Sequence, residues 1–265
     1  MIIKLLNYVL ATIAIILLVG CTTQQEPSSK KETNMEAELI VSAATSLTNS
    51  LEEVKQLFEQ KYPETTVTYN FASSGVLQHQ IEHGAPVDIF FSAGKKQMDH
   101  LIDAELIDQK KTVNLVGNEL VVIVPEGEGD AWDNLSPLLL TSIRTIAIGE
   151  THTVPAGEYA KAALVTSEMW NKMINKIVYA KDARQVLSYV ETGNVDAGIA
   201  YKSDAMSSDN VRIAFIIDAK THDVIEYPLG IVNNSNNPQA AKEFYNYLQS
   251  PEALDIFEKY GFMTN

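Results

Sequence analysis

From residue 38 onward, short apolar runs alternate with segments of helical periodicity, and this alternation restricts the fold more than any other feature of the chain. Residues 39–43 form an apolar run, residues 47–62 place apolar side chains at helical spacing, and residues 66–71 alternate like a strand. Consecutive strands that are separated by a helix usually pair in parallel, because the crossover returns the chain to the same end of the sheet. The sequence therefore predicts an α/β fold with doubly wound sheets.

The series of strands continues after residue 100, and its length favours two sheets over one. Further apolar runs lie at residues 120–125, 145–148, 178–180, 195–201, 211–218 and 224–232. The long segments 118–125 and 224–232 are candidates for strands that cross between two lobes. We therefore expect two doubly wound lobes joined by a two-strand hinge, with lobe 1 at residues 38–117 plus 228–265 and lobe 2 at residues 118–227. A cleft between them would face the carboxyl ends of the strands, where α/β sheets bind ligands.

The N-terminus has the layout of an export signal, because Lys4 precedes a long apolar run and small residues stand just before Cys21. An uncleaved membrane anchor is the alternative, since the apolar run could nearly span a bilayer. The segment LVGC, residues 18–21, resembles a bacterial lipobox, in which the cysteine is diacylated and becomes the new N-terminus. Residues 1–20 are interpreted as a lipoprotein signal peptide and residues 21–36 as a flexible, lipid-anchored tether. Under either reading the folded part lies outside the cytoplasmic membrane.

Charge and cysteine content argue against several classes of function. The formal net charge is −14, which argues against nucleic-acid binding, because phosphate neutralisation needs a basic surface. It also argues against adsorption to anionic lipid through a charged patch. The single cysteine leaves no internal disulfide. The motifs G-x-S-x-G and H-E-x-x-H are absent from the sequence, and we expect no enzymatic activity.

Three strand-to-helix junctions carry small residues that would let a ligand reach the backbone. They are SAATSLT at 42–48, FASSGVL at 71–77 and HTVPAGEYA at 152–160. A helix N-terminus presents unpaired N–H groups and about half a positive charge, and serine hydroxyls add further donors. Each junction alone is compatible with ordinary helix capping. Several such ends that meet at one point would bind a compact anion without Lys or Arg.

These junctions and the segments around them resemble the periplasmic molybdate-binding proteins of ABC importers, which have the type II solute-binding fold. The resemblance covers about residues 39–262 and rests on SLT, ASSG, GAPVD and VPAGEYA in this order, followed by GIAYKSDA, EYPLGIV and FEKYGF. It implies that molybdate or tungstate is held by three hydroxyls and two backbone amides, those of Ser46, Ser74, Tyr201, Ala156 and Ala183. It further implies delivery to an ABC permease by a monomer without a cofactor or a protein-ligated metal ion.

A binding protein of the same fold for sulfate, ferric ion or an organic acid is the alternative. Clustered Tyr, His or carboxylate ligands for iron, or an Arg for a carboxylate, are not evident at the three junctions. A site made only of donors favours a fully deprotonated ion, because an unmatched buried O–H costs roughly 1–3 kcal/mol. Molybdate, tungstate and sulfate satisfy this condition. The choice of molybdate over sulfate rests on the resemblance, and molybdate and tungstate remain undistinguished.

Several charged residues outside this set have competing interpretations. We expect Asp88 to be structural, because a carboxylate that points at an anion would repel it. Arg144 and Arg184 could clamp an anion on charge grounds, although we expect Arg184 to stay at the surface or to pair with an acid. His79 and His83, four residues apart on one helix face, form a possible metal pair without an obvious third ligand, so a solvated face is expected. His152 could line the mouth of a cleft, and the sequence assigns it no role.

Overall fold

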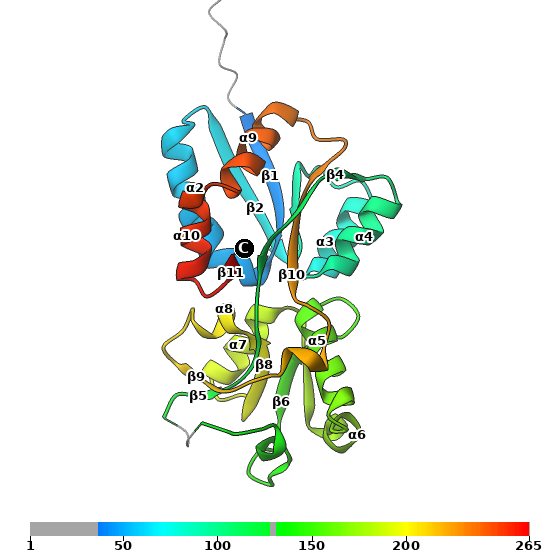
Figure 1. Ribbon diagram of the computed structural model, residues 1–265, viewed down its shortest axis with the longest axis vertical. Helices are drawn as coiled ribbons and strands as arrows, with labels where there is room; N and C mark the ends of the chain where they lie inside the picture. The colour runs from blue at the N-terminus through cyan, green and yellow to red at the C-terminus, as the bar shows by residue number, and fades with distance from the viewer. Residues whose placement is uncertain (1–36, 128–130, 265) are drawn as a thin grey trace, which may run out of the picture. The chain divides into compact units, whose positions relative to one another are not determined.

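The computed structural model describes residues 37–127 and 131–264, which belong to one compact unit. Two sheets with helices on both of their faces make up this unit (Figure 1). The predicted signal peptide, Cys21 and the predicted tether lie outside the described residues. Within the described ranges, every helix is too short or too polar to cross a membrane.

The first sheet has six strands in the order β11-β4-β10-β3-β1-β2. The bounds are β1 (Ala37–Ala44), β2 (Thr65–Ala72), β3 (Ile89–Phe91), β4 (Ile107–Gly117), β10 (Glu226–Val232) and β11 (Met263–Thr264). Strand β1 pairs in parallel with β2 and with β3, whereas β10 runs antiparallel to β3 and to β4. The sheet is therefore mixed: its parallel part comes from the predicted β-α-β order, and its antiparallel part comes from strands that continue toward the second sheet.

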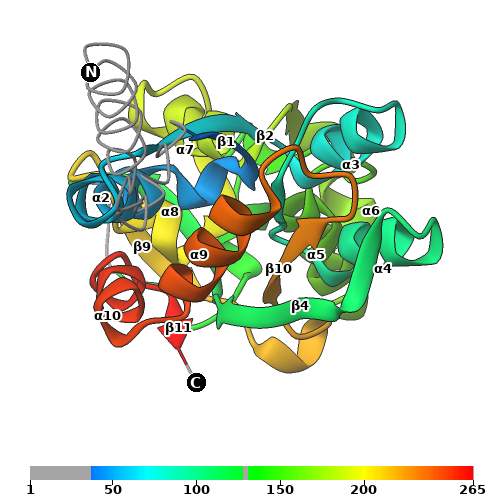
Figure 2. The ribbon, with the colours of Figure 1, turned by 90° about the horizontal axis from the view of Figure 1, so that it is seen from above.

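Helices cover both faces of the first sheet. They are α2 (Thr48–Lys61), α9 (Pro238–Leu248) and α10 (Pro251–Lys259) on one face, and α3 (Ser74–Glu82) and α4 (Lys95–Asp103) on the other (Figure 2). Helix α2 buries Leu51, Val54 and Phe58 at a spacing of three and four residues, which places them on one face. Phe58 packs edge-on against Phe244 of α9 at 4.7 Å between ring centroids.

The second sheet has five strands in the order β7-β6-β8-β5-β9. The bounds are β5 (Leu120–Pro125), β6 (Ile146–Gly149), β7 (Ile177–Ala180), β8 (Ala197–Tyr201) and β9 (Val211–Ile216). The helices of this part are α5 (Pro155–Thr166), α6 (Trp170–Met173), α7 (Ala183–Glu191) and α8 (Lys202–Ala205). Short 3₁₀ turns occupy Thr45–Leu47, Ser136–Leu139, Ile174–Lys176 and Ala219–Thr221.

Helices α5 and α7 pack their apolar residues into different hydrophobic clusters. Ala160 and Leu164 of α5 belong to a cluster that continues into the first sheet, whereas Val186 and Val190 of α7 belong to a separate one. Strands β6, β7 and β8 are parallel, and β5 runs antiparallel to β8 and β9. Both sheets thus have the doubly wound arrangement that the sequence predicts.

The chain passes between the sheets twice, directly from β4 to β5 and again from β9 to β10 (Figure 1). Strand β4 was not predicted, because much of it is exposed or half-buried and carries no apolar run. The lobes expected at residues 38–117 plus 228–265 and at residues 118–227 stay a prediction, since the described residues form a single compact unit.

Candidate anion-binding site

The five residues that the sequence singles out line one small cavity at the carboxyl ends of strands from both sheets. They are Ser46, Ser74, Ala156, Ala183 and Tyr201. The remaining lining residues are Ala44, Thr45, Ala72, Ser73, Ala93, Val154 and Pro155. The three junctions, which lie far apart in the sequence, therefore converge as expected for α/β sheets that face one another. Inside this cavity, the volume open to the centre of a water molecule is only about 10 Å³.

Two of the lining serines follow strands of the first sheet. Ser74 is the first residue of α3 and is fully buried. Its Oγ accepts a hydrogen bond from the Ala93 amide at 2.9 Å, so its own proton remains available. Ser46 lies in the 3₁₀ turn after β1, and its Oγ is 3.0 Å from the Tyr227 hydroxyl. A hydroxyl that already accepts from protein is free to donate to a ligand.

Two buried backbone amides enter from the second sheet. Ala156 follows Pro155 in the first turn of α5, and Ala183 is the first residue of α7. Both are buried, at 0% and 4% exposure, and helix geometry gives the amides of the first turn no acceptor within their own helix. Their methyl side chains leave the amides uncovered. The positive ends of two helix dipoles therefore lie at the cavity, whose lining residues carry no charged side chain.

Close packing of α5 against β6 sets the position of the Ala156 amide. A Cβ atom on Gly157 would lie 2.0 Å from the Gly149 carbonyl oxygen, which is far inside van der Waals contact. Glycine at position 157 thus lets the first turn of α5 rest directly on the end of β6. Pro155 suits the same turn, because its missing N–H would have no partner there.

Tyr201 ends β8 and is almost fully buried at 1% exposure. Its hydroxyl donates to the Ala93 carbonyl at 3.2 Å, which joins the second sheet to the loop after β3. Burial raises the pKa of the Tyr201 phenol well above its ordinary value, and the neighbouring Tyr227 adds to this effect. The phenol therefore stays protonated at neutral pH, and its proton is engaged by Ala93 in this arrangement.

One buried carboxyl lies close to the cavity without lining it. Asp204 in α8 accepts a hydrogen bond from the Tyr201 amide at 3.4 Å. Burial raises the pKa of this carboxyl to about 7, against the opposing effects of that hydrogen bond and of the Arg184 charge. No lysine or arginine lines the cavity, so within the described residues any preference for an anion must come from hydroxyls and amides.

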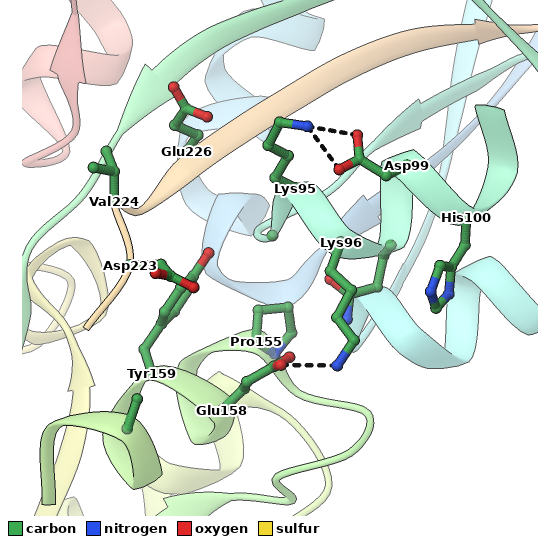
Figure 3. Close-up of a pocket in the computed structure, with 13 residues that line it drawn as sticks. Lys95, Lys96, Asp99, His100, Pro155, Glu158, Tyr159, Asp223, Val224 and Glu226 are labelled. Carbon is green, nitrogen blue, oxygen red and sulfur yellow. Dashed lines mark hydrogen bonds and ion pairs between the residues drawn. The ribbon is translucent and has the colours of Figure 1, made fainter. Parts of the chain in front are cut away.

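Other contacts hold the two sides of the cavity together. The Gly75 amide donates to the Thr153 carbonyl at 2.9 Å. Lys96 at the start of α4 pairs with Glu158 of α5 at 2.8 Å, beside a larger cavity of about 590 Å³ that also contacts Pro155 (Figure 3). The second of these contacts is exposed, and such ion pairs contribute little to stability.

The charged residues with competing interpretations do not line the cavity. Asp88 accepts from the Ile40 amide at 2.8 Å and from Ser235 Oγ at 2.6 Å, which agrees with a structural role. Arg184 is at the surface as expected, but its Nη1 donates to Asn49 Oδ1 at 2.9 Å, so its partner is an amide rather than an acid.

The remaining candidates have no place at the cavity either. Arg144 and His152 are exposed and do not line it. His79 Nδ1 lies 2.9 Å from Glu82, and His83 Nδ1 lies 2.7 Å from the His79 carbonyl. In residues 37–127 and 131–264, no group of three His, Cys, Asp or Glu side chains could hold a metal ion.

Sequence reasoning missed three polar residues around the cavity. Ser73 lines it, is 4% exposed and has an Oγ without a partner among the described residues. Asn118 and Tyr227 lie behind Ser46 and connect to it by hydrogen bonds. The SSG sequence could have drawn attention to Ser73, whereas nothing local links positions 118 and 227 to position 46.

Known binding proteins are similar to this chain over most of its length. YvgL of Bacillus subtilis, whose name assigns it provisionally as an ABC transporter substrate-binding lipoprotein, is 44% identical over 255 residues and 96% of both chains. The molybdate-binding protein ModA of Escherichia coli is 38% identical over 86% of this chain and 89% of its own.

A solved structure from Clostridium difficile, whose name assigns it provisionally as the substrate-binding domain of a molybdenum ABC transporter, superposes with a TM-score of 0.68. It is 36% identical and covers 86% of this chain and 99% of its own. These names describe binding proteins rather than enzymes. Residues 39–263 match a family described as bacterial extracellular solute-binding protein. The chain therefore belongs to the family of bacterial extracellular solute-binding proteins.

Proposed function

We propose that this protein captures molybdate or tungstate in the cavity lined by Ser46, Ser74, Ala156, Ala183 and Tyr201, and delivers the ion to an ABC permease. The observation that carries the proposal is the convergence of hydroxyls and buried backbone amides on one cavity without a lining lysine, arginine or carboxylate. Such donors replace the hydration shell of a small dianion. The 38% identity to a relative named for molybdate binding supports the choice of ion.

The donor set favours an ion without a proton. Hydrogen phosphate carries an O–H that would need an acceptor, and a buried O–H without one costs roughly 1–3 kcal/mol. Among the lining residues, the Ala93 carbonyl already accepts from Tyr201, and Ser74 Oγ already accepts from the Ala93 amide. Molybdate, tungstate and sulfate are all fully deprotonated at neutral pH, and the similarity to a relative named for molybdate binding favours molybdate, with tungstate of nearly equal size, over sulfate.

Capture of the ion requires motion of the two lobes. The cavity has room for about one water molecule, which is less than a five-atom oxyanion needs. Contacts such as Gly75 to Thr153 and Tyr201 to Ala93 join the two sides of the cavity. We infer that the lobes separate about the β4–β5 and β9–β10 connections to admit the ion and then close on it by hinge motion.

The anion preference can be measured on the chain that begins at residue 36, because residues 36–265 form a compact unit. Isothermal titration calorimetry with molybdate, tungstate, sulfate and phosphate should give tight binding of the first two and binding at least tenfold weaker for the others. Equal or tighter binding of sulfate would favour the sulfate alternative. Absence of heat with molybdate and tungstate would refute the proposal.

We further propose that Cys21 carries a lipid that tethers the protein to the outer face of the cytoplasmic membrane. The LVGC segment supports this anchor, as does the similarity to YvgL, whose name includes the word lipoprotein. Cys21→Ser should move the protein from the membrane fraction to the soluble fraction in cell fractionation. Membrane retention of this variant would favour the uncleaved membrane anchor instead.

A further inference from the structure

A chain of hydrogen bonds leads from the β4–β5 connection to Ser46. Asn118 Nδ2 donates to the Tyr227 hydroxyl at 3.2 Å, and this hydroxyl lies 3.0 Å from Ser46 Oγ. Asn118 is 4% exposed and Tyr227 is fully buried. Neither of the two lines the cavity, but Tyr227 contacts two residues that do: Ser46 through this hydrogen bond, and Tyr201 through an edge-on ring contact at 5.6 Å between centroids.

The direction of these hydrogen bonds follows from Asn118. Its Oδ1 accepts from the amides of Glu119 at 2.9 Å and of Ser203 at 3.4 Å. Its Nδ2 also donates to Ser203 Oγ at 2.8 Å. Because an amide NH₂ group only donates, the Tyr227 oxygen is the acceptor in its contact with Asn118.

We assign Tyr227 as the donor to Ser46. Burial raises the pKa of the Tyr227 phenol well above its ordinary value, and the Asp204 charge adds to this effect, so the phenol keeps its proton. The Asn118 amide cannot accept this proton, whereas Ser46 Oγ lies within hydrogen-bond distance. With Tyr227 as donor, Ser46 is an acceptor toward the protein, and its own proton is left for the cavity.

Ser74 Oγ is also an acceptor toward the protein, but its donor is a backbone amide. The Ala93 amide donates to Ser74 Oγ at 2.9 Å, and a backbone amide cannot reverse its role. Ser46 instead depends on a side-chain hydroxyl, which could in principle turn. Its role as a donor is therefore fixed only as long as Asn118 and Tyr227 stay in place.

We propose that Tyr227 and Asn118 are positioning residues that hold the Ser46 hydroxyl as a donor and thereby set the preference for fully deprotonated oxyanions. This inference rests on the proposed function. A Ser46 hydroxyl that is free to turn could accept the O–H of hydrogen phosphate. The oriented Ser46 hydroxyl presents its proton rather than an acceptor to that O–H, whereas it donates equally well to every oxygen of molybdate.

The test compares Tyr227→Phe with the unsubstituted protein by calorimetry with molybdate and with phosphate at neutral pH. The affinity ratio of molybdate to phosphate should fall at least fivefold in the variant. Tyr69→Phe is the matched control, because Tyr69 is a half-buried tyrosine whose hydroxyl donates at 2.8 Å to the Leu51 carbonyl and which does not line the cavity. This control should leave the ratio unchanged.

A double-mutant cycle separates action through Ser46 from a general effect on packing. In the Ser46→Ala background, Tyr227→Phe should leave the affinity ratio unchanged, because the hydroxyl through which Tyr227 acts is gone. An equal fall in both backgrounds, or no fall in either, would overturn the inference. Should Tyr227→Phe fail to fold, Asn118→Leu keeps the phenol but removes its donor, and it should lower the same ratio.

The outcomes also distinguish this inference from the proposed function. Tight molybdate binding with an unchanged ratio in the variants contradicts the role of Tyr227 and Asn118 alone. No molybdate binding by the unsubstituted protein contradicts the proposed function and, with it, this inference.

Discussion

The first sheet brings side-chain hydroxyls to the cavity, whereas the second brings mostly backbone amides. Ser46 and Ser74 follow strands of the first sheet, and Ala156 and Ala183 begin helices of the second. A hydroxyl can be removed by one substitution with little change elsewhere. An amide can be altered only by moving its helix, so the donors of the second sheet are protected by packing. Substitution of a hydroxyl on the first-sheet side should therefore lower ion affinity while the fold is kept. Displacement of a helix on the second-sheet side should lower ion affinity and stability together.

The largest effect is expected for loss of both hydroxyls on the first-sheet side. Hydrogen bonds to a charged group are worth about 1.5–3 kcal/mol each, so Ser46→Ala combined with Ser74→Ala should weaken molybdate binding at least a hundredfold. Calorimetry measures the affinity, and circular dichroism checks the fold.

The matched control for this variant is Ser50→Ala combined with Ser207→Ala. Both of these hydroxyls donate to carbonyls within their own chain segments, those of Leu47 and Asp204, and neither lines the cavity. The control should keep the original affinity. Equal losses in the two double variants would show that the hydroxyls at the cavity have no special role.

The second-sheet side also holds the buried carboxyl of Asp204, whose pKa is raised to about 7 mainly by burial. Between pH 4 and pH 7 the folded state keeps a proton that the unfolded state releases, so this group lowers stability as pH rises through that window. The full effect above pH 7 is on the order of 4 kcal/mol. Asp204→Asn should remove it.

Urea unfolding at pH 4 and at pH 8 measures this difference. The unsubstituted protein should lose more unfolding free energy between these two values than Asp204→Asn loses. The same pH dependence in both proteins would mean that folding does not raise the pKa of Asp204.

A smaller effect is expected when the helix that carries a backbone donor is displaced. A Cβ at position 157 would meet the Gly149 carbonyl at 2.0 Å, so Gly157→Ala should shift the first turn of α5. Overpacking of this kind costs about 1–3 kcal/mol, seen as a lower thermal midpoint. Molybdate affinity should fall along with it, because the Ala156 amide moves too. A variant that loses stability but keeps full affinity would argue against a contact at Ala156.

The smallest effect is expected for the ion pair that joins the two sides at the surface. Lys96→Gln removes the contact with Glu158 between α4 and α5, beside the larger cavity, whereas Lys95→Gln removes a contact with Asp99 inside α4 (Figure 3). Exposed pairs contribute at most about 1 kcal/mol. Stopped-flow measurement should show molybdate release up to about fivefold faster for Lys96→Gln at low salt, and no change for Lys95→Gln. Equal rates in both variants would rule out a closing role for Lys96.

The sequence predicted the parts of this arrangement that depend on local pattern. The alternation of strands and helices predicted the doubly wound sheets, and the small residues at strand-to-helix junctions drew attention to Ser46, Ser74 and Ala156, which the fold brings to one cavity. Strand β4 escaped prediction because its pairing with β10 and β11, rather than an apolar run, defines it. The link from Asn118 to Tyr227 spans 109 positions, and only the folded chain brings these residues together.

Crystallography of the chain from residue 36 grown with molybdate tests the central claim most directly, because molybdenum can be located by its anomalous scattering. We predict one ion in the cavity, within hydrogen-bond distance of the Ser46 and Ser74 hydroxyls and of the Ala156 and Ala183 amides. An ion held by lysine or arginine side chains elsewhere, with this cavity still closed and empty, would contradict the account.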